Sequence, residues 1–163
     1  MYKEREKKTM YTFIMLKYDA LERELAEAIL QRFKKEGFNI EIVGFKKATR
    51  EIIIAHYEEA FGRIPGLEEK ALKDLVDKDF MPIILSSNHE NTIEKAREII
   101  GATDPIKAEA GTIRKDFGID SREKADSENR WLDNLIHSCD SKESYNNEIK
   151  IWLGDEIYNQ YKY

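Results

Sequence analysis

Four short apolar runs, separated by stretches with helical spacing, place the strongest constraint on the fold of this chain. Apolar residues three and four positions apart predict helices between the runs. The order is then strand, helix, strand, helices, strand, helix, strand, helix, which favours an α+β sandwich with helices on a mainly antiparallel sheet. The runs assigned to strands are residues 12–16, 38–47, 81–85 and 134–138. The predicted helices run from residue 21 to a stop at Gly37, over residues 50–61, 67–76 and 92–100, and beyond residue 141.

Two places in this pattern lead to specific expectations. Pro82 lies near the start of the third run, which predicts an edge or strand-start position because proline cannot donate a ladder hydrogen bond. From residue 102 to residue 133 the periodicity fades and the segment is predicted to be irregular. A loop of this length in a compact domain is usually functional or partly disordered.

Composition limits the classes of protein that the chain can belong to. Hydrophobic residues make up 41% and charged residues 36% of 163 residues, as in a soluble domain with one core. The net charge of −5 argues against a general nucleic-acid or membrane-surface binder. An anionic ligand would have to be attracted by a few locally placed cations. No apolar run approaches membrane-spanning length.

Cysteine usage and the start of the chain bear on the cellular compartment. Cys139 is the single cysteine, which excludes an intramolecular disulfide and fits a reducing compartment. Residues 1–9 form a charged tail without the apolar core of a signal peptide. We therefore expect a cytoplasmic protein with a single domain over residues 1–163.

The fourth run carries the most informative residue, His137. The run is short and apolar, delivers this histidine, and then turns into a helix. Asp140 followed three residues later by Glu143 predicts a capping box with Asp140 as the N-cap. A histidine beside the positive end of a helix is well placed to handle an anionic group. An isolated histidine at such a position more often only makes hydrogen bonds.

Three cations fall beside chain breaks or strand ends, namely Lys17, Arg97 and Arg114, and Thr103 offers a hydroxyl near Arg97. Arginine forks suit phosphate oxygens, and lysine acts as a point charge. Taken singly, each is more often a solvated surface charge. The sequence has no GxxxxGK[ST] or GxGxxG phosphate loop and no Cys/His cluster with metal-ligand spacing. We interpret the other histidines as a helix-surface residue (His56) and a loop residue (His89).

Together these residues resemble the nucleoside diphosphate kinase family. The match runs in order from the first strand to the last long helix. The matching pieces are Thr12-Phe13-Ile14-Met15-Leu16-Lys17-x-Asp19, His56-Tyr57, Pro65-Gly66-Leu67, Ala96-Arg97, Gly101-x-Thr103-x-Pro105, Gly111-Thr112-Ile113-Arg114-x-Asp116-Phe117, Asn134-x-Ile136-His137-x-x-Asp140-Ser141, Glu148-Ile149 and Trp152.

The resemblance implies a ferredoxin-like βαββαβ sandwich with a four-stranded antiparallel sheet covered by helices. It also implies transfer of the γ-phosphoryl group of a nucleoside triphosphate to a nucleoside diphosphate by a ping-pong mechanism. His137 would be the nucleophile and form a phosphohistidine, which lets donor and acceptor use one site. Glu148 would hold one ring nitrogen of His137, and Lys17 would complete the catalytic set.

The resemblance also assigns the nucleotide contacts. Lys17, Tyr57, Arg97, Thr103 and Arg114 match positions that hold the phosphates. Asn134 and Lys17 match those that contact the sugar, and Leu67 matches an apolar position near the base. Mg²⁺ would be carried by the nucleotide phosphates and not by protein ligands. A homo-oligomer is implied, with no membrane and no specific nucleic acid as partners.

Four departures from the family pattern mark this chain. Tyr18 stands where the family has proline. The segment between Tyr57 and Pro65 is short and lacks the paired aromatics that stack on the base, with Phe61 or Ile64 as possible substitutes, so we expect broad base tolerance. Residues 118–133 are an insertion, in which Trp131 and Leu132 are expected at a subunit contact or over the site entrance. Ser138-Cys139 replaces a small residue followed by serine.

Cys139 has two interpretations. As a thiol two residues beyond the nucleophile, at a helix mouth, it would be reactive and its modification would inhibit the enzyme. As a buried small hydrophobe it would be inert.

Two other functional classes compete with the kinase. A non-catalytic nucleotide-binding or scaffolding relative would need no nucleophile, and the intact set of His137, Glu148 and cations argues against it. A ferredoxin-like RNA-binding module would need exposed aromatics on strands and a basic face. The net charge of −5 and the apolar strands argue against that module.

Overall fold

The computed structural model describes residues 8–163; residues 1–7 of the predicted tail lie outside the described residues. Its centre is one antiparallel sheet with the order β2-β4-β1-β5, and a short β3 pairs with β4 beside β2. The strands are β1 (Met10–Leu16), β2 (Asn39–Val43), β3 (Lys46–Lys47), β4 (Asp79–Ser87) and β5 (Ile136–Ser138). Apart from the added β3, this is the ferredoxin-like strand order implied by the resemblance.

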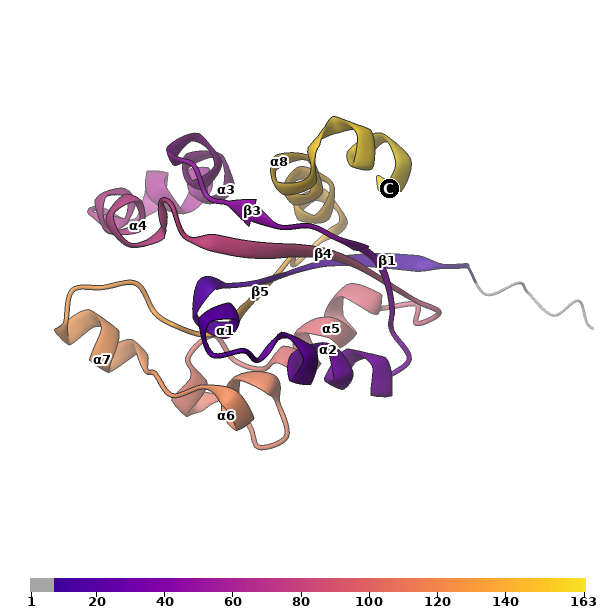
Figure 1. Cartoon of the computed structure of the whole chain (residues 1–163), viewed down its shortest axis with the longest axis horizontal. Helices are drawn as coiled ribbons and strands as arrows, with labels where there is room; N and C mark the ends of the chain where they lie inside the picture. Colours follow the sequence, from indigo (N-terminus) through magenta and orange to yellow (C-terminus); the bar gives the residue numbers. More distant parts are fainter. Residues whose placement is uncertain (1–7) are drawn as a thin grey trace, which may run out of the picture.

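Helices cover both faces of the sheet (Figure 1). On one face lie α1 (Tyr18–Glu22), α2 (Ala26–Lys35) and α5 (Thr92–Ile100), and on the other lie α3 (Arg50–Arg63), α4 (Leu67–Leu75) and α8 (Lys142–Tyr161). Side chains of β1 alternate between the two cores, with Ile14 and Leu16 in the first and Phe13 and Met15 in the second. Because both sides of β1 and β4 are buried, these strands read as continuous apolar runs.

Pro82 is not at an edge, contrary to the sequence expectation. It lies in β4, which pairs with β1 on one side and with β2 on the other. The carbonyl of Pro82 accepts a hydrogen bond from the amide of Gly44 (2.8 Å), just beyond the end of β2. The N–H and C=O of a strand residue point to the same neighbour. The position that a Pro82 N–H would occupy therefore faces the gap between β2 and β3. No hydrogen bond between assigned strands is lost there.

Two helix boundaries also differ from expectation. The single predicted helix from residue 21 is two helices, because Glu24 adopts φ 57° between α1 and α2. The N-cap of α8 is Ser141 and not Asp140: the Ser141 hydroxyl accepts from the Ser144 amide, and the Ser144 hydroxyl accepts from the Ser141 amide, each at 3.0 Å. The capping box thus exists, one residue further along the chain.

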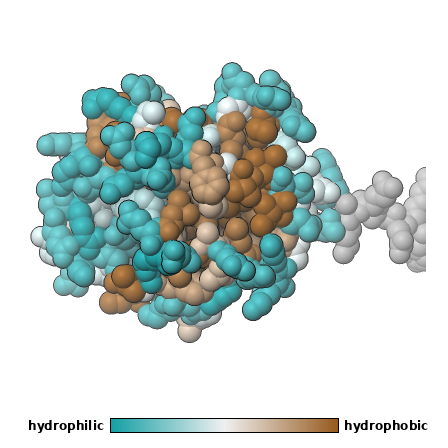
Figure 2. Space-filling model, viewed as in Figure 1, coloured by the Kyte–Doolittle hydropathy of each residue, from teal (hydrophilic) through white to brown (hydrophobic). Residues whose placement is uncertain are grey.

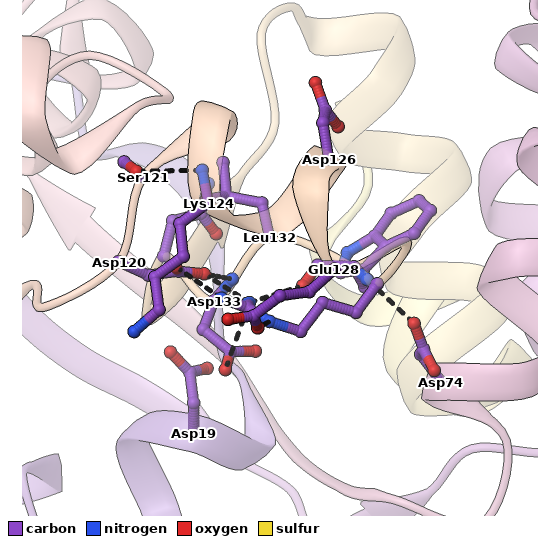
Figure 3. Close-up of polar contacts among 12 residues, drawn as sticks. Asp19, Asp74, Asp120, Ser121, Lys124, Asp126, Glu128, Leu132 and Asp133 are labelled. Atoms are coloured by element: carbon purple, nitrogen blue, oxygen red, sulfur yellow. Dashed lines mark hydrogen bonds and ion pairs between the residues drawn. The ribbon is translucent and has the colours of Figure 1, made fainter.

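The predicted irregular segment, residues 102–133, is ordered. It contains a 3-10 turn η1 (Pro105–Lys107) and two short helices, α6 (Ile113–Phe117) and α7 (Arg122–Ser127). Thr112 and Ser121 cap the two helices through their hydroxyls. Arg130 holds the end of the segment by ion pairs to Asp120 (2.6 Å) and Glu128 (2.6 Å) (Figure 3). Hydrogen bonds that are local in sequence, which hydrophobic periodicity cannot reveal, give this segment its structure.

The C-terminus closes the domain. Tyr163 docks on β1, where its hydroxyl donates to the Tyr11 carbonyl and accepts from the Tyr11 amide, each at 2.6 Å. No helix among residues 8–163 is both long and apolar enough to cross a membrane.

An apolar patch faces the viewer in Figure 2, over the part of Figure 1 that holds β3 and β4. Near it, the side chains of Val43 and Phe45 are 46% and 74% exposed. Val43 is the last residue of β2, an edge strand of the sheet, and Phe45 lies between β2 and β3.

Candidate active site

A large cavity of about 1140 Å³ opens where the ends of β1 and β5 meet α3, α4, α5 and the segment 102–133. All seven nucleotide-binding residues suggested by the sequence lie on its wall. The sequence-predicted residues on the wall are Lys17, Tyr57, Leu67, Arg97, Thr103, Arg114, Asn134 and His137. The ninth, Glu148, lies just behind His137. The structure therefore brings together all nine residues from eight separate places in the fold.

His137 is positioned by the sheet and by α8. It lies in the middle of β5, opposite Met15 of β1, and its side chain is 26% exposed. Its Nε2 is 2.8 Å from Oε1 of the buried Glu148, two turns into α8. Since a carboxylate accepts, Nε2 carries the proton and Nδ1 keeps its lone pair. Among the described residues Nδ1 has no hydrogen-bond partner, so it is available to react.

Lys17 reaches the same cavity from the end of β1. Its Nζ donates to the carbonyl of Leu132 and to Oδ1 of Asn134, each at 2.8 Å. The Asn134 amide in turn donates to the Thr103 carbonyl at 3.0 Å. Burial lowers the pKa of Lys17 from 10.5 to about 8, against the opposing charge of Asp19. Lys17 is thus a buried cation with a fixed direction, poorly stabilised until an anion arrives.

Arg114 is held by main-chain carbonyls. It donates to Asn134 (3.2 Å), Gly101 (3.1 Å) and Ile136 (2.5 Å), which leaves the remaining guanidinium hydrogens free for a ligand. Burial lowers the pKa of Arg114 to about 10, and the nearby positive charge of Arg97 lowers it further. Two arginines held this close repel each other unless an anion lies between them.

His56 is not the helix-surface residue that we expected. Its ring centroid lies 4.6 Å from that of His137, and its Nδ1 accepts a hydrogen bond from the Trp152 indole at 2.9 Å. Burial keeps the pKa of His56 well below its ordinary value. The one sequence signal that His56 lies near the site was its position directly before Tyr57, whose ring packs edge-on against it. His89 lies in the loop before α5, as expected, with its ring at 3.1 Å from the Glu36 carbonyl.

The cluster of His56, His137 and Glu148 has the chemistry of a metal site but not the right tautomer. One ligand atom from each residue lies within 4.8 Å of the others. However, indole can only donate, so Trp152 makes Nδ1 of His56 an acceptor. The proton of neutral His56 then sits on Nε2 and blocks that nitrogen as a ligand. The residues fit a hydrogen-bonded histidine pair better than a cation.

Two departures from the family pattern have clear structural roles. The Tyr18 hydroxyl donates to Asp133 at 2.5 Å and ties α1 to the insertion; burial and this bond raise the pKa of Tyr18. Cys139 is fully buried, with its sulfur 3.4 Å from the Thr12 hydroxyl and from the Phe13 amide. Burial raises the pKa of the Cys139 thiol to about 12. The reactive-thiol interpretation is therefore wrong, and the buried interpretation is correct.

The paired aromatics that the sequence lacks direct attention to the residues around Tyr57 on the cavity wall. Ile64 and Leu67 lie on the wall, whereas Phe61 does not and packs against Tyr57. Trp131, from the insertion, lies on the wall and packs edge-on against Tyr57 with ring centroids 5.1 Å apart. This agrees with the expectation that Trp131 lies over the site entrance. Leu132 is buried beneath it.

Comparisons with known proteins agree with this site and fold. The model of the nucleoside diphosphate kinase family matches residues 10–157. The chain is 35% identical over 150 residues to a nucleoside diphosphate kinase from Methanocaldococcus jannaschii, covering 91% of this chain and 97% of that protein. It is 37% identical over 154 residues to one from Pyrococcus furiosus, covering 93% and 88%.

Solved structures agree as well. The crystal structure of an NDP kinase from Pyrobaculum aerophilum is 28% identical and superposes with a TM-score of 0.78, covering 91% of this chain and 98% of that one. The family match spans nearly all of the described residues, including β1, which Lys17 directly follows, and β5, which carries His137. The chain therefore belongs to the nucleoside diphosphate kinase family and is a nucleotide-binding phosphotransferase.

Proposed function

We propose that the chain transfers the γ-phosphoryl group of a nucleoside triphosphate to a nucleoside diphosphate through a phosphohistidine at His137. The observation that carries this proposal is the His137–Glu148 pair at 2.8 Å, which leaves Nδ1 free on the wall of a cavity that is also lined by Lys17, Arg97 and Arg114. The Nδ1 lone pair attacks the γ-phosphorus, and the bond to the bridging oxygen breaks. The nucleoside diphosphate leaves with the electron pair of the broken bond. The proton on Nε2 stays in its hydrogen bond to Glu148.

The second half-reaction reverses the first. A terminal phosphate oxygen of another nucleoside diphosphate attacks the phosphorus, and the P–N bond breaks. Glu148 stabilises the positive charge that the ring carries while Nδ1 is phosphorylated, because its carboxylate accepts from Nε2. Catalysis of phosphoryl transfer rests largely on positioning and on charge neutralisation. Both are roles that the hydrogen-bonded His137–Glu148 pair and the fixed cations can fill.

The phosphates would be held by residues from four elements. Lys17 and Arg114 are directed into the cavity by the hydrogen bonds described above. Arg97, Tyr57 and Thr103 line the same wall. Burial raises the pKa of the Tyr57 phenol, so it remains a neutral donor for a phosphate oxygen. Charge attraction thus comes from local cations in a protein whose net charge is −5.

The sugar and the divalent ion can be placed on the same grounds. Asn134 and Lys17, 2.8 Å apart, would contact the sugar hydroxyls, and Leu67 would lie near the base. The cavity presents cations to phosphate oxygens, while the one ligand cluster found among residues 8–163 lacks a suitable tautomer. We therefore propose that Mg²⁺ arrives on the nucleotide phosphates. When bound there, it neutralises the charge that builds up on the phosphate oxygens.

Domain organisation, assembly and compartment complete the proposal. We propose one domain over residues 1–163, with a charged tail at 1–9 and the insertion at 118–133. The exposed Val43 and Phe45 beside the edge strand β2 support a homo-oligomer, because a hydrophobic sheet edge is usually covered. The single cysteine and the net negative charge favour a cytoplasmic protein without a specific nucleic-acid partner.

The direct test is to incubate the protein with ATP labelled in the γ-phosphate, without an acceptor. We expect an acid-labile, base-stable adduct that is lost in His137→Ala and is transferred to added diphosphate. His89→Ala serves as the matched control and should form the adduct at the normal level. No adduct in the unmodified protein, or an adduct that persists in His137→Ala, would reject the proposal in favour of a nucleotide-binding role.

A further inference from the structure

We propose that the Tyr18 hydroxyl is a positioning group for Lys17: it holds the Asp133 carboxylate away from the Lys17 ammonium, so that the ammonium stays open to a phosphate. This inference rests on the proposed function, because it names a further residue that shapes the same phosphate site. Tyr18 does not line the cavity and acts only through Asp133 and Lys17. Both partners of the bond are departures from the family pattern, Tyr18 in place of proline and Asp133 as the last residue of the insertion 118–133.

The backbone at position 18 does not explain the tyrosine. Tyr18 is the first residue of α1, where proline is favoured because the amide there has no acceptor within the helix. Lys17 before it is extended, with φ −86° and ψ 163°, a conformation that suits a following proline. The proline of the family pattern would therefore fit here, and the reason for a tyrosine lies in its side chain.

The side chain of Tyr18 reaches from the core to the insertion. Its ring packs edge-on against the buried Phe80 of β4, with ring centroids 6.0 Å apart. Its hydroxyl donates to Oδ1 of Asp133 at 2.5 Å, across 115 residues of the chain. A short hydrogen bond to a charged acceptor, made by a ring that is packed on the sheet, fixes the carboxylate in place. The part of the phosphate site that is anchored in the core thus extends to the last residue of the insertion.

Asp133 lies between the two residues that hold Lys17. The Lys17 Nζ donates to the Leu132 carbonyl and to the Asn134 side chain, each at 2.8 Å. An ammonium group has three N–H donors, so one hydrogen remains for a ligand in the cavity. Leu132 and Asn134 line the cavity, whereas Asp133 does not. A carboxylate that could take the third hydrogen therefore sits between the two acceptors of Lys17 but is directed away from the cavity.

The charges around Lys17 show why the direction of this carboxylate matters. Burial lowers the pKa of Lys17 to about 8, and the negative charges of Asp19 and Asp133 oppose this shift. Both carboxylates are therefore close enough to attract the ammonium. Asp19 is held by the Leu135 amide, which donates to its Oδ2 at 3.0 Å. Asp133 is held in the corresponding way by the Tyr18 hydroxyl.

The other contacts of Asp133 do not fix its carboxylate. Its amide donates to Asp120 at 2.9 Å, which fixes the backbone only (Figure 3). Its Oδ2 lies 4.0 Å from the Arg130 guanidinium, which is already paired with Asp120 and Glu128 at 2.6 Å. Without the Tyr18 hydroxyl, the Asp133 side chain is therefore free to rotate. The buried ammonium would then attract it, and the carboxylate would compete with phosphate.

The test is a double-mutant cycle on Tyr18 and Asp133. Tyr18→Phe removes the hydroxyl and keeps the ring on Phe80, Asp133→Asn removes the charge, and a third variant carries both changes. Tyr163→Phe is the matched control, because it removes a hydroxyl that bonds to Tyr11 at 2.6 Å, outside the cavity wall. The probes are ADP and inorganic tripolyphosphate, which has neither sugar nor base. Calorimetry gives Kd, the transfer assay gives kcat and KM, and thermal unfolding checks the folding of each variant.

We expect Tyr18→Phe to raise the Kd of tripolyphosphate and of ADP by the same factor, roughly tenfold, in line with one hydrogen bond to a charged group. Asp133→Asn alone should bind both probes as tightly as the unmodified protein or more tightly, because a negative charge near the phosphates is removed. Adding Asp133→Asn to Tyr18→Phe should restore the Kd to within about threefold of normal. Values of kcat/KM should follow the same order, and Tyr163→Phe should change none of them. A hydroxyl with a merely structural role would give no such rescue.

Three results would overturn the inference. One is unchanged tripolyphosphate affinity in Tyr18→Phe, and another is a double variant that binds as weakly as Tyr18→Phe. The third is weaker binding in Asp133→Asn alone, which would show that Lys17 needs the carboxylate; this result decides even if Tyr18→Phe does not fold. Failure of the proposed function looks different: no phosphoryl transfer by the unmodified protein with any nucleotide. In that case the tripolyphosphate affinities still decide the role of Tyr18.

Discussion

The phosphate end of the cavity rests on strand ends and main-chain hydrogen bonds, whereas the base end rests on the insertion and on α4. Lys17, Asn134 and His137 lie at or beside the ends of β1 and β5, which pair directly in the sheet. Trp131 is held by a contact to Asp74, 57 residues away in the chain, and by a contact to its neighbour Arg130. The first end has its geometry fixed by the core of the fold, and the second by polar contacts on top of it.

This difference indicates where in the cavity amino-acid substitutions are tolerated. A shift at the phosphate end would have to move the strands themselves, and these are packed between two cores. A shift at the base end breaks polar contacts, among them the Arg130–Asp120 pair, but leaves both cores in place. We therefore expect substitutions at the phosphate end to impair transfer for every nucleotide, and those at the base end to act on affinity for the base alone.

The sharpest contrast should come from Arg114→Ala. Because Arg114 combines a buried charge with three bonds to loop carbonyls, we expect kcat/KM to fall by roughly 10²–10³. The same loss is predicted for Lys17→Ala. The fall should be equal for ADP and CDP acceptors. Lys115→Ala, a neighbouring exposed cation, is the control, and near-normal kinetics in Arg114→Ala would show that the phosphates bind elsewhere.

Glu148→Gln should have the next largest effect. The amide can still accept from Nε2 of His137, but it no longer stabilises the charged ring, so we predict a fall in kcat of about tenfold or more. KM should change little, and the phosphoenzyme should form more slowly in rapid-quench measurements. Glu156→Gln, exposed on the same helix, is the control. Unchanged kcat in Glu148→Gln would mean that the ion pair is structural only.

Asp74→Ala tests the base end. Removing the acceptor for the Trp131 amide should loosen the ring, and we predict a three- to fivefold rise in the KM of nucleotides, on the order of one weak hydrogen bond. Affinity for tripolyphosphate should not change. Asp79→Ala, which removes an exposed acid paired with Lys47, is the comparison variant. A loss of tripolyphosphate affinity in Asp74→Ala would erase the distinction between the two ends.

Lys17 gives the phosphate end a pH signature. Its pKa of about 8 in the free protein means that it is partly neutral at pH 8.5, and bound phosphate must raise that pKa. Binding at pH 8.5 should therefore take up a fraction of a proton, and affinity should fall as pH rises above 8. Calorimetry in two buffers with different ionisation enthalpies measures the uptake. ADP and tripolyphosphate should give the same proton uptake, and the Lys17→Met variant should show no proton uptake.

Cys139 belongs to neither end, and we predict no effect of thiol reagents on the native protein. Its burial and its raised pKa keep the thiolate population negligible. A maleimide should leave activity intact for hours and react only after denaturation. Modification of the folded protein, followed by mass spectrometry, would contradict the buried position.

The sequence predicts the phosphate end of the cavity better than the base end, for a physical reason. Local periodicity predicts the strands at residues 12–16 and 134–138 and the helix at residues 92–100. Lys17 directly follows the first strand, His137 lies in the second, and Arg97 lies in the helix. Family-like motifs then mark the remaining positions. The structure brings all of these residues to one cavity.

What the sequence did not foretell depends on tertiary contacts. The position of His56 follows from a hydrogen bond to Trp152, 96 residues away in the chain. The central place of Pro82 follows from the gap between β2 and β3, which no local pattern reveals. The order in the segment 102–133 comes from caps and ion pairs, and these leave no hydrophobic period. The burial of Cys139 follows from the way β5 pairs with β1.

The site of phosphorylation within His137 tests the central claim most directly. Glu148 accepts the hydrogen bond from Nε2 of His137 and leaves Nδ1 to react. The phosphoenzyme formed from ATP alone can be isolated and its phosphohistidine isomer determined by NMR and peptide mapping. We predict a single adduct on Nδ1 of His137. A phosphoryl group on Nε2 of His137, or on His56, would contradict the arrangement of the phosphate end on which the rest of the account depends.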